Sequence, residues 1–93
     1  MQIHHQKDIE IVKTHKTDTL ERFPLKLVEN IASGENPIKV FRQYRHLTRA
    51  MLAEKANVSR QYIFQIENGE KIGSTRILKA IAGVLKVDLE DII

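Results

Sequence analysis

Apolar residues recur at helical spacing along most of the chain after residue 24. The clearest stripe has i, i+3, i+4, i+7 and i+8 spacing and consists of Ile77, Ala80, Ile81, Val84 and Leu85. This spacing is typical of a helix that buries one face. An earlier segment is predicted as a helix that Pro24 opens and Gly34 ends, with the apolar residues Leu25, Leu27, Val28 and Ile31.

Residues suited to helix N-caps define the other boundaries. Asn36, followed by Pro37, predicts a helix that ends near His46 and carries Ile38, Phe41 and Tyr44 inward. Thr48, Ser59 and Asp88 are each flanked by two apolar residues five positions apart, as in a hydrophobic staple. The pairs are Leu47 with Leu52, Val58 with Ile63, and Val87 with Ile92. With Ser74 as the N-cap of the striped helix, residues 37–93 are predicted to form five short helices in an all-α fold.

This pattern divides the chain into an N-terminal arm (1–23), an extra helix with its joint (24–36) and a main domain (37–93). Within the arm, Ile9, Glu10 and Ile11 alternate as in a short edge strand. A single strand has nothing to pair with in this chain, so the arm is interpreted either as a strand that pairs with a partner or as a mobile segment.

Composition excludes several classes of protein. A length of 93 residues suits one compact domain with a short extension. The chain has no cysteine, which excludes disulfides and thiolate metal sites. No stretch reaches the roughly 18 consecutive apolar residues of a membrane helix, and the polar start from Met1 to Glu10 lacks a secretory signal. We therefore expect a cytoplasmic protein without a membrane partner.

The excess positive charge lies in the C-terminal part. Residues 37–93 contain ten Lys or Arg against six Asp or Glu, whereas residues 1–36 contain five against six. A basic balance is compatible with a nucleic-acid partner, but it is common among soluble domains. The positions of the charges therefore matter more than their sum.

The segment from Leu47 to Asn68 predicts two helices of about eight residues, joined by Asn57 and Val58. So short a joint makes the helices cross steeply. Ala53 is small enough to lie at their closest approach, and the expected shared core consists of Leu52, Val58, Ile63 and Ile66. Asn57 stands where the backbone is expected to be left-handed, which Asn tolerates better than most residues.

This segment resembles the lambda-repressor-like helix-turn-helix family of the Cro/cI or XRE type, over about residues 37–93. The resemblance is carried by Leu47-Thr48, Leu52-Ala53-Glu54-Lys55-Ala56, Val58-Ser59, Ile63 and Ile66-Glu67-Asn68-Gly69. Family members usually have Gly in place of Asn57 and often in place of His46, and both replacements tolerate a positive φ. The resemblance implies that double-stranded DNA is the partner and that the helix after Ser59 enters the major groove.

The resemblance also implies roles for individual residues. Base reading falls to Arg60, Gln61 and Gln65, and their chemistry agrees, because Arg can pair with guanine and Gln with adenine in bidentate fashion. Contacts to the DNA backbone are implied for Arg49, Ser59, Tyr62, the main-chain N–H near Asn68, Lys71 and Arg76. A plain surface role is the alternative for Arg49, Lys71 and Arg76, and a thymine-methyl contact for Tyr62. Arg42 and Glu67 match a partly buried ion pair that joins the first helix to the recognition helix.

Other candidate chemistry is sparse. Phe64 stands where relatives generally have a polar residue, and three roles stay open for it: a thymine-methyl contact, a dimer contact or a core residue. The four histidines are scattered, and none pairs with a carboxylate at i+4 on a helix, so no metal site is expected. No catalytic constellation or Gly-rich phosphate loop is recognisable. The sequence therefore predicts neither an enzyme nor a cofactor.

A second resemblance concerns the layout of the chain. The segment from Phe23-Pro24 to Gly34-Glu35-Asn36-Pro37, which runs directly into the XRE domain, is similar to HigA-like antitoxins of type II toxin–antitoxin modules. These are encoded beside a RelE-like toxin, which they neutralise, and they repress their own operon. The alternatives are a stand-alone XRE regulator and a protein-interaction module that does not read DNA. A regulator of either kind would associate with the nucleoid when bound to DNA.

A homodimer is expected, because one recognition helix covers only about four to six base pairs. The apolar residues Leu89, Ile92 and Ile93 at the C-terminus either complete the core or form the dimer surface. We expect Leu89 and Ile92 to belong to the core and Ile93 to lie nearer the interface.

Overall fold

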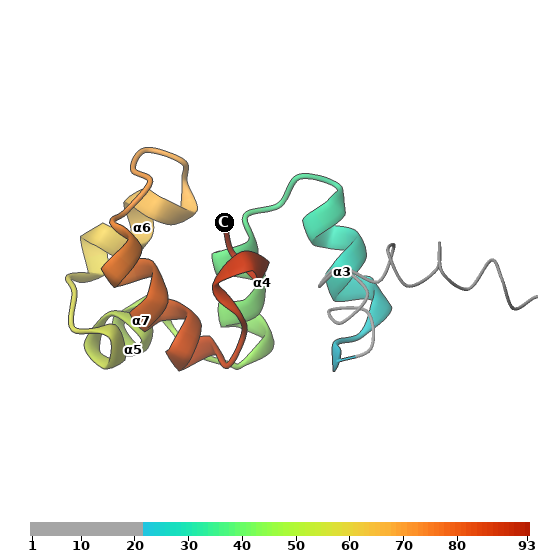
Figure 1. The fold of residues 1–93 in the computed structure, drawn as a ribbon, viewed down its shortest axis with the longest axis horizontal. Coiled ribbons are helices and arrows are strands. Elements are labelled where there is room, and N and C mark those ends of the chain that lie inside the picture. The colour runs from blue at the N-terminus through green and yellow to red at the C-terminus, as the bar shows by residue number, and fades with distance from the viewer. Residues whose placement is uncertain (1–21) are drawn as a thin grey trace, which may run out of the picture.

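The computed structural model describes residues 22–93 (Figure 1). This part of the chain is all-α. Its elements are α3 (Leu25–Ala32), α4 (Pro37–Tyr44), α5 (Arg49–Ala56), α6 (Arg60–Glu67), α7 (Thr75–Leu85) and a 3₁₀ turn, η1 (Leu89–Asp91). Residues 37–93 thus form the five predicted elements, the last of them a 3₁₀ turn rather than an α-helix. The edge strand predicted at Ile9–Ile11 lies outside the described residues.

The predicted caps are present, and they explain where the helices begin. The side-chain oxygens of Thr48, Ser59 and Ser74 accept hydrogen bonds from the backbone N–H groups three residues later, at 3.0, 3.0 and 3.3 Å. Asn36 caps α4 in the same way through the N–H of Lys39, at 3.1 Å, with Pro37 as the first helical residue. Each bond satisfies an N–H group that has no partner within its helix.

Left-handed residues end several helices. Asn57 has a φ of 60° after α5, as predicted, and His46 after α4 has the same value. Gly34, with a φ of 111°, follows the end of α3. Lys86 after α7 also has a positive φ, 61°, which was not predicted. These residues turn the chain within a few positions and keep the joints short.

The core consists of side chains from every helix, including the phenyl ring of Phe41 and the side chains of Leu52, Ile63, Ile81 and Leu85, all fully buried. The α7 stripe was predicted partly in the wrong phase. Ala80 is exposed, whereas Leu78 and Ala82 are buried beside Ile81 and Leu85. Apolar residues cover more than half of the circumference of this helix, so periodicity alone does not fix which of them face inward.

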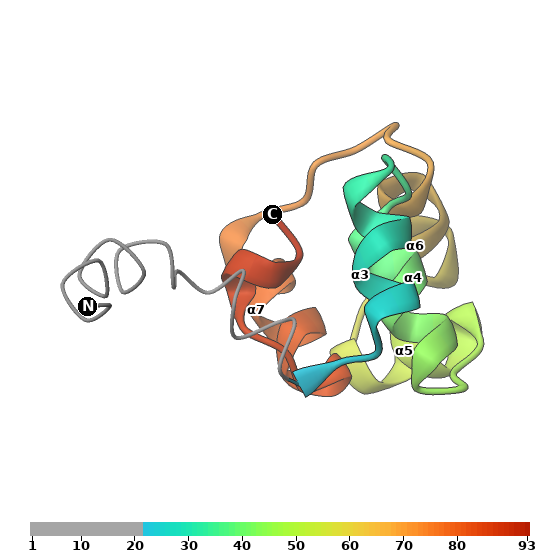
Figure 2. The same ribbon diagram turned by 90° about the vertical axis from the view of Figure 1, so that its right-hand side faces the viewer.

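Helix α3 packs against α4 at the end of the molecule away from α5 and α6 (Figures 1 and 2). Phe23, which the sequence division placed at the end of the arm, is buried, with its ring 5.0 Å edge-on from that of Phe41. The prediction that Tyr44 points inward is wrong. Tyr44 is 37% exposed, and its ring packs edge-on 5.6 Å from that of Phe23, at the rim of the core rather than inside it.

The C-terminal residues divide as expected between core and surface. Ile92 is buried, Leu89 is partly buried against the core, and Ile93 is 73% exposed. The carboxylate of Asp91 in η1 accepts hydrogen bonds from the Asp88 N–H, at 2.9 Å, and from Arg22, at 3.0 Å. This contact joins the segment before α3 to the end of the chain. None of the helices described is long and apolar enough to cross a membrane.

Candidate nucleic-acid interface

Helices α5 and α6 form a rigid two-helix unit. In Figure 1, α5 is seen nearly end-on and α6 lies above it, and the two helices are in contact. Ala53 is buried between them, as predicted, and its carbonyl accepts a hydrogen bond from the N–H of Val58 in the joint, at 2.9 Å. Ile63 and Ile66 bury the inner face of α6 in the core. Because its inner face is fixed in this way, α6 presents its other face at a defined angle.

The side chains predicted to read bases lie on that outer face. Arg60 and Gln61, in the first turn of α6, are exposed, and Gln65 is half-buried. Arg60 and Gln61 also line a surface hollow of about 870 Å³ between the N-terminal turns of α5 and α6, here called the α5–α6 hollow. Its lining residues are Arg42, Leu47, Thr48, Arg49, Ala50, Arg60, Gln61 and Phe64. The structure therefore brings two of the three residues together at one opening.

The predicted ion pair between Arg42 and Glu67 is confirmed. Arg42 Nε lies 2.6 Å from Glu67 Oε2, its Nη2 lies 3.2 Å from Oε1, and both residues are buried. Arg42 also donates through Nη1 to the carbonyl of Leu47, at 2.9 Å. This arrangement fixes α4, the joint before α5 and the end of α6 to one another.

Sequence reasoning missed a second arginine on the same carboxylate. Arg49 Nε lies 2.9 Å from Glu67 Oε1, and the Arg49 side chain is about one-third exposed. Its guanidinium carbon also lies 5.2 Å from the centre of the Phe64 ring. Glu67 thus binds one arginine inside the core and a second at the edge of the α5–α6 hollow. The sequence could have suggested this second partner, because the two oxygens of a carboxylate can accept hydrogen bonds from two arginines.

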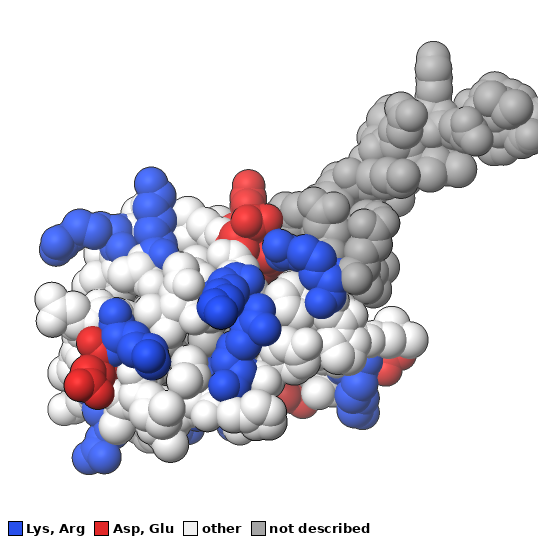
Figure 3. Space-filling view, turned by 90° about the horizontal axis from the view of Figure 1, so that it is seen from below, with Lys and Arg blue, Asp and Glu red and all other residues white. Residues whose placement is uncertain are grey.

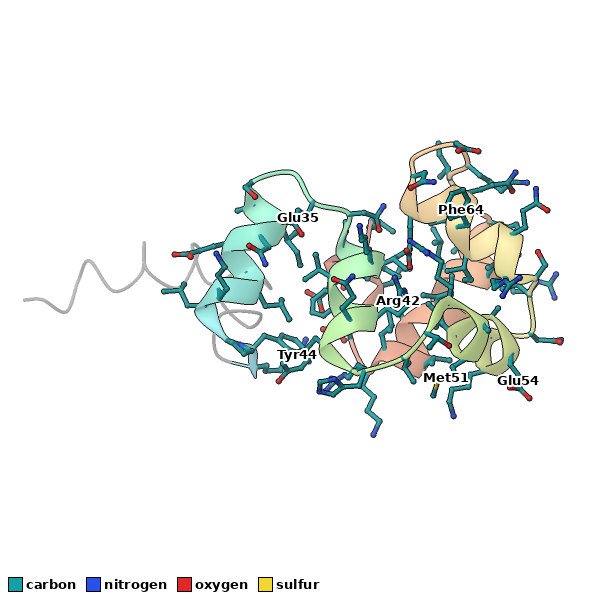
Figure 4. The ribbon with its side chains drawn as sticks, turned by 180° about the vertical axis from the view of Figure 1, so that it is seen from behind. Glu35, Arg42, Tyr44, Met51, Glu54 and Phe64 are labelled. Atoms are coloured by element: carbon teal, nitrogen blue, oxygen red, sulfur yellow. The ribbon has the colours of Figure 1, made fainter. Side chains whose placement is uncertain are left out.

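Phe64 is not a core residue. Its side chain is 43% exposed, and it lines the α5–α6 hollow. Figure 4 shows Phe64 on α6, in the upper part of the view, and Met51 on α5, in the lower part. Of the three roles proposed for Phe64 from the sequence, the structure removes burial and leaves contact with DNA or with a second protein.

The residues predicted to contact the DNA backbone differ in how far their polar groups are already bonded within the protein. The Ser59 hydroxyl caps α6, and the Tyr62 hydroxyl accepts the N–H of Ser74 at 3.3 Å. The N–H of Asn68 is bonded to the carbonyl of Phe64 at 3.0 Å, so a phosphate contact at Asn68 falls to its exposed side chain. Lys71 and Arg76 are exposed, and Lys71 Nζ lies 5.0 Å from the Tyr62 ring centre.

The loop after α6 is held close to that helix by Gly73. Its φ is 88°, and a Cβ atom there would lie 3.1 Å from Ile66 Cδ1 and 3.4 Å from the Tyr62 hydroxyl. A side chain at this position would therefore be strained in backbone conformation and crowded. The close approach keeps Lys71 beside the outer face of α6.

Positive charge is not confined to the α5–α6 hollow. On the face shown in Figure 3, Lys and Arg side chains are spread over the surface, with fewer acidic side chains among them. Within residues 22–93, no group of three or more His, Asp or Glu side chains is arranged to hold a metal ion.

Comparison with known proteins agrees with this geometry. A family model described as helix-turn-helix matches residues 38–92. The chain is 43% identical over 56 residues to an immunity repressor protein of Bacillus phage phi105. These residues are 60% of this chain and 39% of that protein. It is 40% identical over 58 residues to an uncharacterized HTH-type transcriptional regulator of Methanocaldococcus jannaschii, covering 62% of this chain and 88% of the relative. No solved structure matches the chain.

A third relative, the ImmF control region 10 kDa protein of phage phi105, is 38% identical over 52 residues, which are 56% of this chain and 58% of that protein. The chain therefore matches less than two thirds of the length of either phage protein. In all three relatives the match is about as long as the stretch that contains α4 to η1. The match to the family model covers more than half of the chain, and the chain belongs to the helix-turn-helix family of the Cro/cI type.

Proposed function

We propose that this protein is a sequence-specific DNA-binding transcriptional regulator that acts as a repressor. The observation that carries the proposal is the exposure of Arg60 and Gln61 in the first turn of α6, a helix whose opposite face is fixed in the core. A helix inserted into the major groove reads base edges with side chains at its N-terminal end. The similarity to the phage immunity repressor and to the archaeal HTH-type transcriptional regulator supports the same function.

The proposed contacts divide into two groups. Arg60, Gln61 and Gln65 read bases, since Arg and Gln each offer two hydrogen-bonding groups that fit one base edge, and each good pair contributes about 1–3 kcal/mol of discrimination. Contacts with phosphate position the protein without reading sequence, and we assign them to Arg49, Ser59, Tyr62, Asn68, Lys71 and Arg76. No chemistry is assigned to this surface beyond binding.

The test is a selection of bound duplexes from a random pool, followed by a gel shift with the recovered site. We expect the wild-type protein to recover a defined site and the double variant Arg60→Ala/Gln61→Ala to lose preference for it. The matched control is Lys55→Ala/Gln43→Ala, which removes the same charge and one amide from exposed positions outside the α5–α6 hollow. Equal loss of preference in both variants, or recovery of no defined site, would show that α6 does not read DNA.

Binding as a homodimer is part of the proposal. Two-fold pairing would place two α6 helices about one DNA turn, ~34 Å, apart and so double the sequence that is read. Ile93, the exposed apolar residue at the C-terminus, is our candidate for the dimer contact. Sedimentation of the Ile93→Asp variant should then show a higher proportion of monomer than the wild type, and the selected site should consist of two inverted halves.

The antitoxin role is a separate candidate that rests on the layout of α3 and the joint from Gly34 to Pro37. This role requires a RelE-like toxin as partner. The three relatives are a repressor, a transcriptional regulator and a control-region protein, and none is described as an antitoxin. A reading frame for a small basic protein beside the gene, and its co-purification with this chain, would support the antitoxin. A chain that represses its own promoter without such a neighbour is a stand-alone regulator, and a chain that binds proteins but no defined DNA site is an interaction module.

A further inference from the structure

A large apolar side chain lies among the polar residues that we propose to read bases. Phe64 follows Arg60 and Gln61 by four and three residues on α6, so all three project from one side of the helix, and all three line the α5–α6 hollow. Single exposed apolar residues are common on protein surfaces, so the exposure of Phe64 alone indicates nothing. Its position among the base-reading residues is the informative observation.

The Phe64 ring is also held in place. The Arg49 guanidinium lies over it at 5.2 Å from the ring centre, within the range of a cation–π contact. Arg49 is in turn bound to Glu67, whose side chain is fully buried and is also bonded to Arg42. A ring restrained by a chain of contacts that reaches the core loses little conformational freedom on binding a ligand.

We infer that Phe64 reads the C5-methyl group of thymine. The inference rests on the proposed function, because it requires α6 to lie in the major groove. The hydrogen-bonding atoms of the bases dominate that groove, and the thymine methyl is the apolar group that the base edges present there. A phenyl ring can bury a methyl group, whereas burial of a polar base edge against it would leave donors or acceptors unsatisfied. Phe64 therefore selects thymine at the position that it contacts.

Electrostatics favour DNA over an apolar protein partner at this place. Arg42, Arg49 and Arg60 line the same α5–α6 hollow as Phe64. Only one carboxylate is bonded to these arginines in the described residues, that of Glu67, and it is buried. An anionic duplex is attracted by the charges of Arg49 and Arg60, whereas an apolar protein surface would have to remove water from these two side chains.

The test removes single methyl groups from the DNA. The recovered site is synthesised with deoxyuridine in place of one thymidine at a time, a change that keeps every hydrogen-bonding group of the base pair. We expect replacement of the thymidine that Phe64 contacts in one half-site to weaken binding of the wild-type protein about fourfold, the value expected for loss of one buried methyl group at about 0.8 kcal/mol. The Phe64→Ala variant should bind the thymidine and deoxyuridine duplexes equally.

Two further variants complete the experiment. Phe64→Leu should retain part of the preference for thymidine, because its side chain is still apolar. Met51→Ala, which alters an exposed apolar residue of α5 outside the hollow, should behave as the wild type. A wild-type protein indifferent to every replacement, or an equal fourfold effect in Phe64→Ala, overturns the inference while leaving the proposed function intact. Failure to recover any defined site overturns both.

Discussion

The side-chain amide nitrogen of Asn36 lies 3.1 Å from the backbone carbonyl of Ile66 and donates a hydrogen bond to it. The amide oxygen of the same residue caps α4 through the N–H of Lys39. One side chain therefore fixes the beginning of α4 against the last turn of α6. The angle at which α6 is presented depends on this contact as well as on apolar packing.

Two variants of Asn36 separate the two bonds. Asn36→Ser keeps a good N-cap but cannot reach Ile66, so we expect it to lower the free energy of unfolding by about 1 kcal/mol. Asn36→Ala removes the cap as well and should lower it by about 2 kcal/mol. Urea denaturation measures both values. Equal stability of the two variants would mean that the cap bond to the Lys39 N–H contributes nothing.

Glu67 is expected to contribute more to stability than to recognition. Glu67→Ala leaves the buried guanidinium of Arg42 without its partner, which typically costs about 3–5 kcal/mol. Arg49→Ala removes a partner that is about one-third exposed, and its loss should cost no more than about 1 kcal/mol. Thermal denaturation of the two variants should therefore differ clearly. A Glu67→Ala melt identical to that of the wild type would refute the structural role of the pair.

The residues proposed to contact phosphate should act through salt dependence. Lys71→Ala and Arg76→Ala are each expected to reduce the slope of log affinity against log salt by about 0.9 per protomer of the bound dimer and to leave the preferred sequence unchanged. Fluorescence anisotropy over a salt series measures the slope. Lys79→Ala, an exposed lysine in the middle of α7, is the control and should not alter the slope. A change in base preference in either variant would contradict the assignment.

The local features of this fold were predictable from the sequence because they depend on neighbouring residues. A hydroxyl or amide at Asn36, Thr48, Ser59 or Ser74 satisfies N–H groups only three positions away, so the helix starts were correct. The pairing of Arg42 with Glu67, in contrast, was inferred from the family resemblance. It joins residues 25 positions apart, and no local pattern indicates it.

The predictions that failed concern the orientation of side chains and one strained backbone conformation. Ala80 was placed inward because apolar residues surround it at several helical phases, and only tertiary packing chooses among those phases. Tyr44 was placed inward because it follows Phe41 at helical spacing, but it lies at the end of α4, where the ring is only partly covered. The contact of Arg49 with Glu67 was not predicted, because the family resemblance implies a phosphate contact for Arg49. Lys86 adopts a left-handed conformation for which lysine has no preference, so its sequence could not reveal it.

Phe23 is expected to hold α3 and α4 together. Its buried ring contacts both Phe41 and Tyr44, and Arg45 lies over it at 5.5 Å. Phe23→Ala should lower the free energy of unfolding by about 3–5 kcal/mol, because it removes a buried aromatic ring and leaves a cavity. Leu25→Ala, two residues later but 62% exposed, should change it by less than about 0.5 kcal/mol. Urea denaturation of both variants checks this, and similar losses would show that α3 is not held through Phe23.

Lys86 offers a test of opposite sign. Its φ of 61° is strained for a residue with a Cβ atom, whereas glycine adopts it freely. Lys86→Gly should therefore stabilise the protein, by about 0.5 kcal/mol after the extra freedom of glycine in the unfolded chain is subtracted. That gain raises the melting temperature by about 2–4 °C in a domain of this size.

The control is the same substitution at Lys79, an exposed residue within α7. There the backbone is helical, so glycine should lower stability by about 1 kcal/mol. Both variants remove one lysine side chain and one positive charge, and the favourable interaction of the Lys86 charge with the C-terminal end of α7 is lost only in Lys86→Gly. A gain in stability in that variant therefore reports the relief of backbone strain. If both substitutions lower the melting temperature, the positive φ at Lys86 does not store the strain that we assign to it.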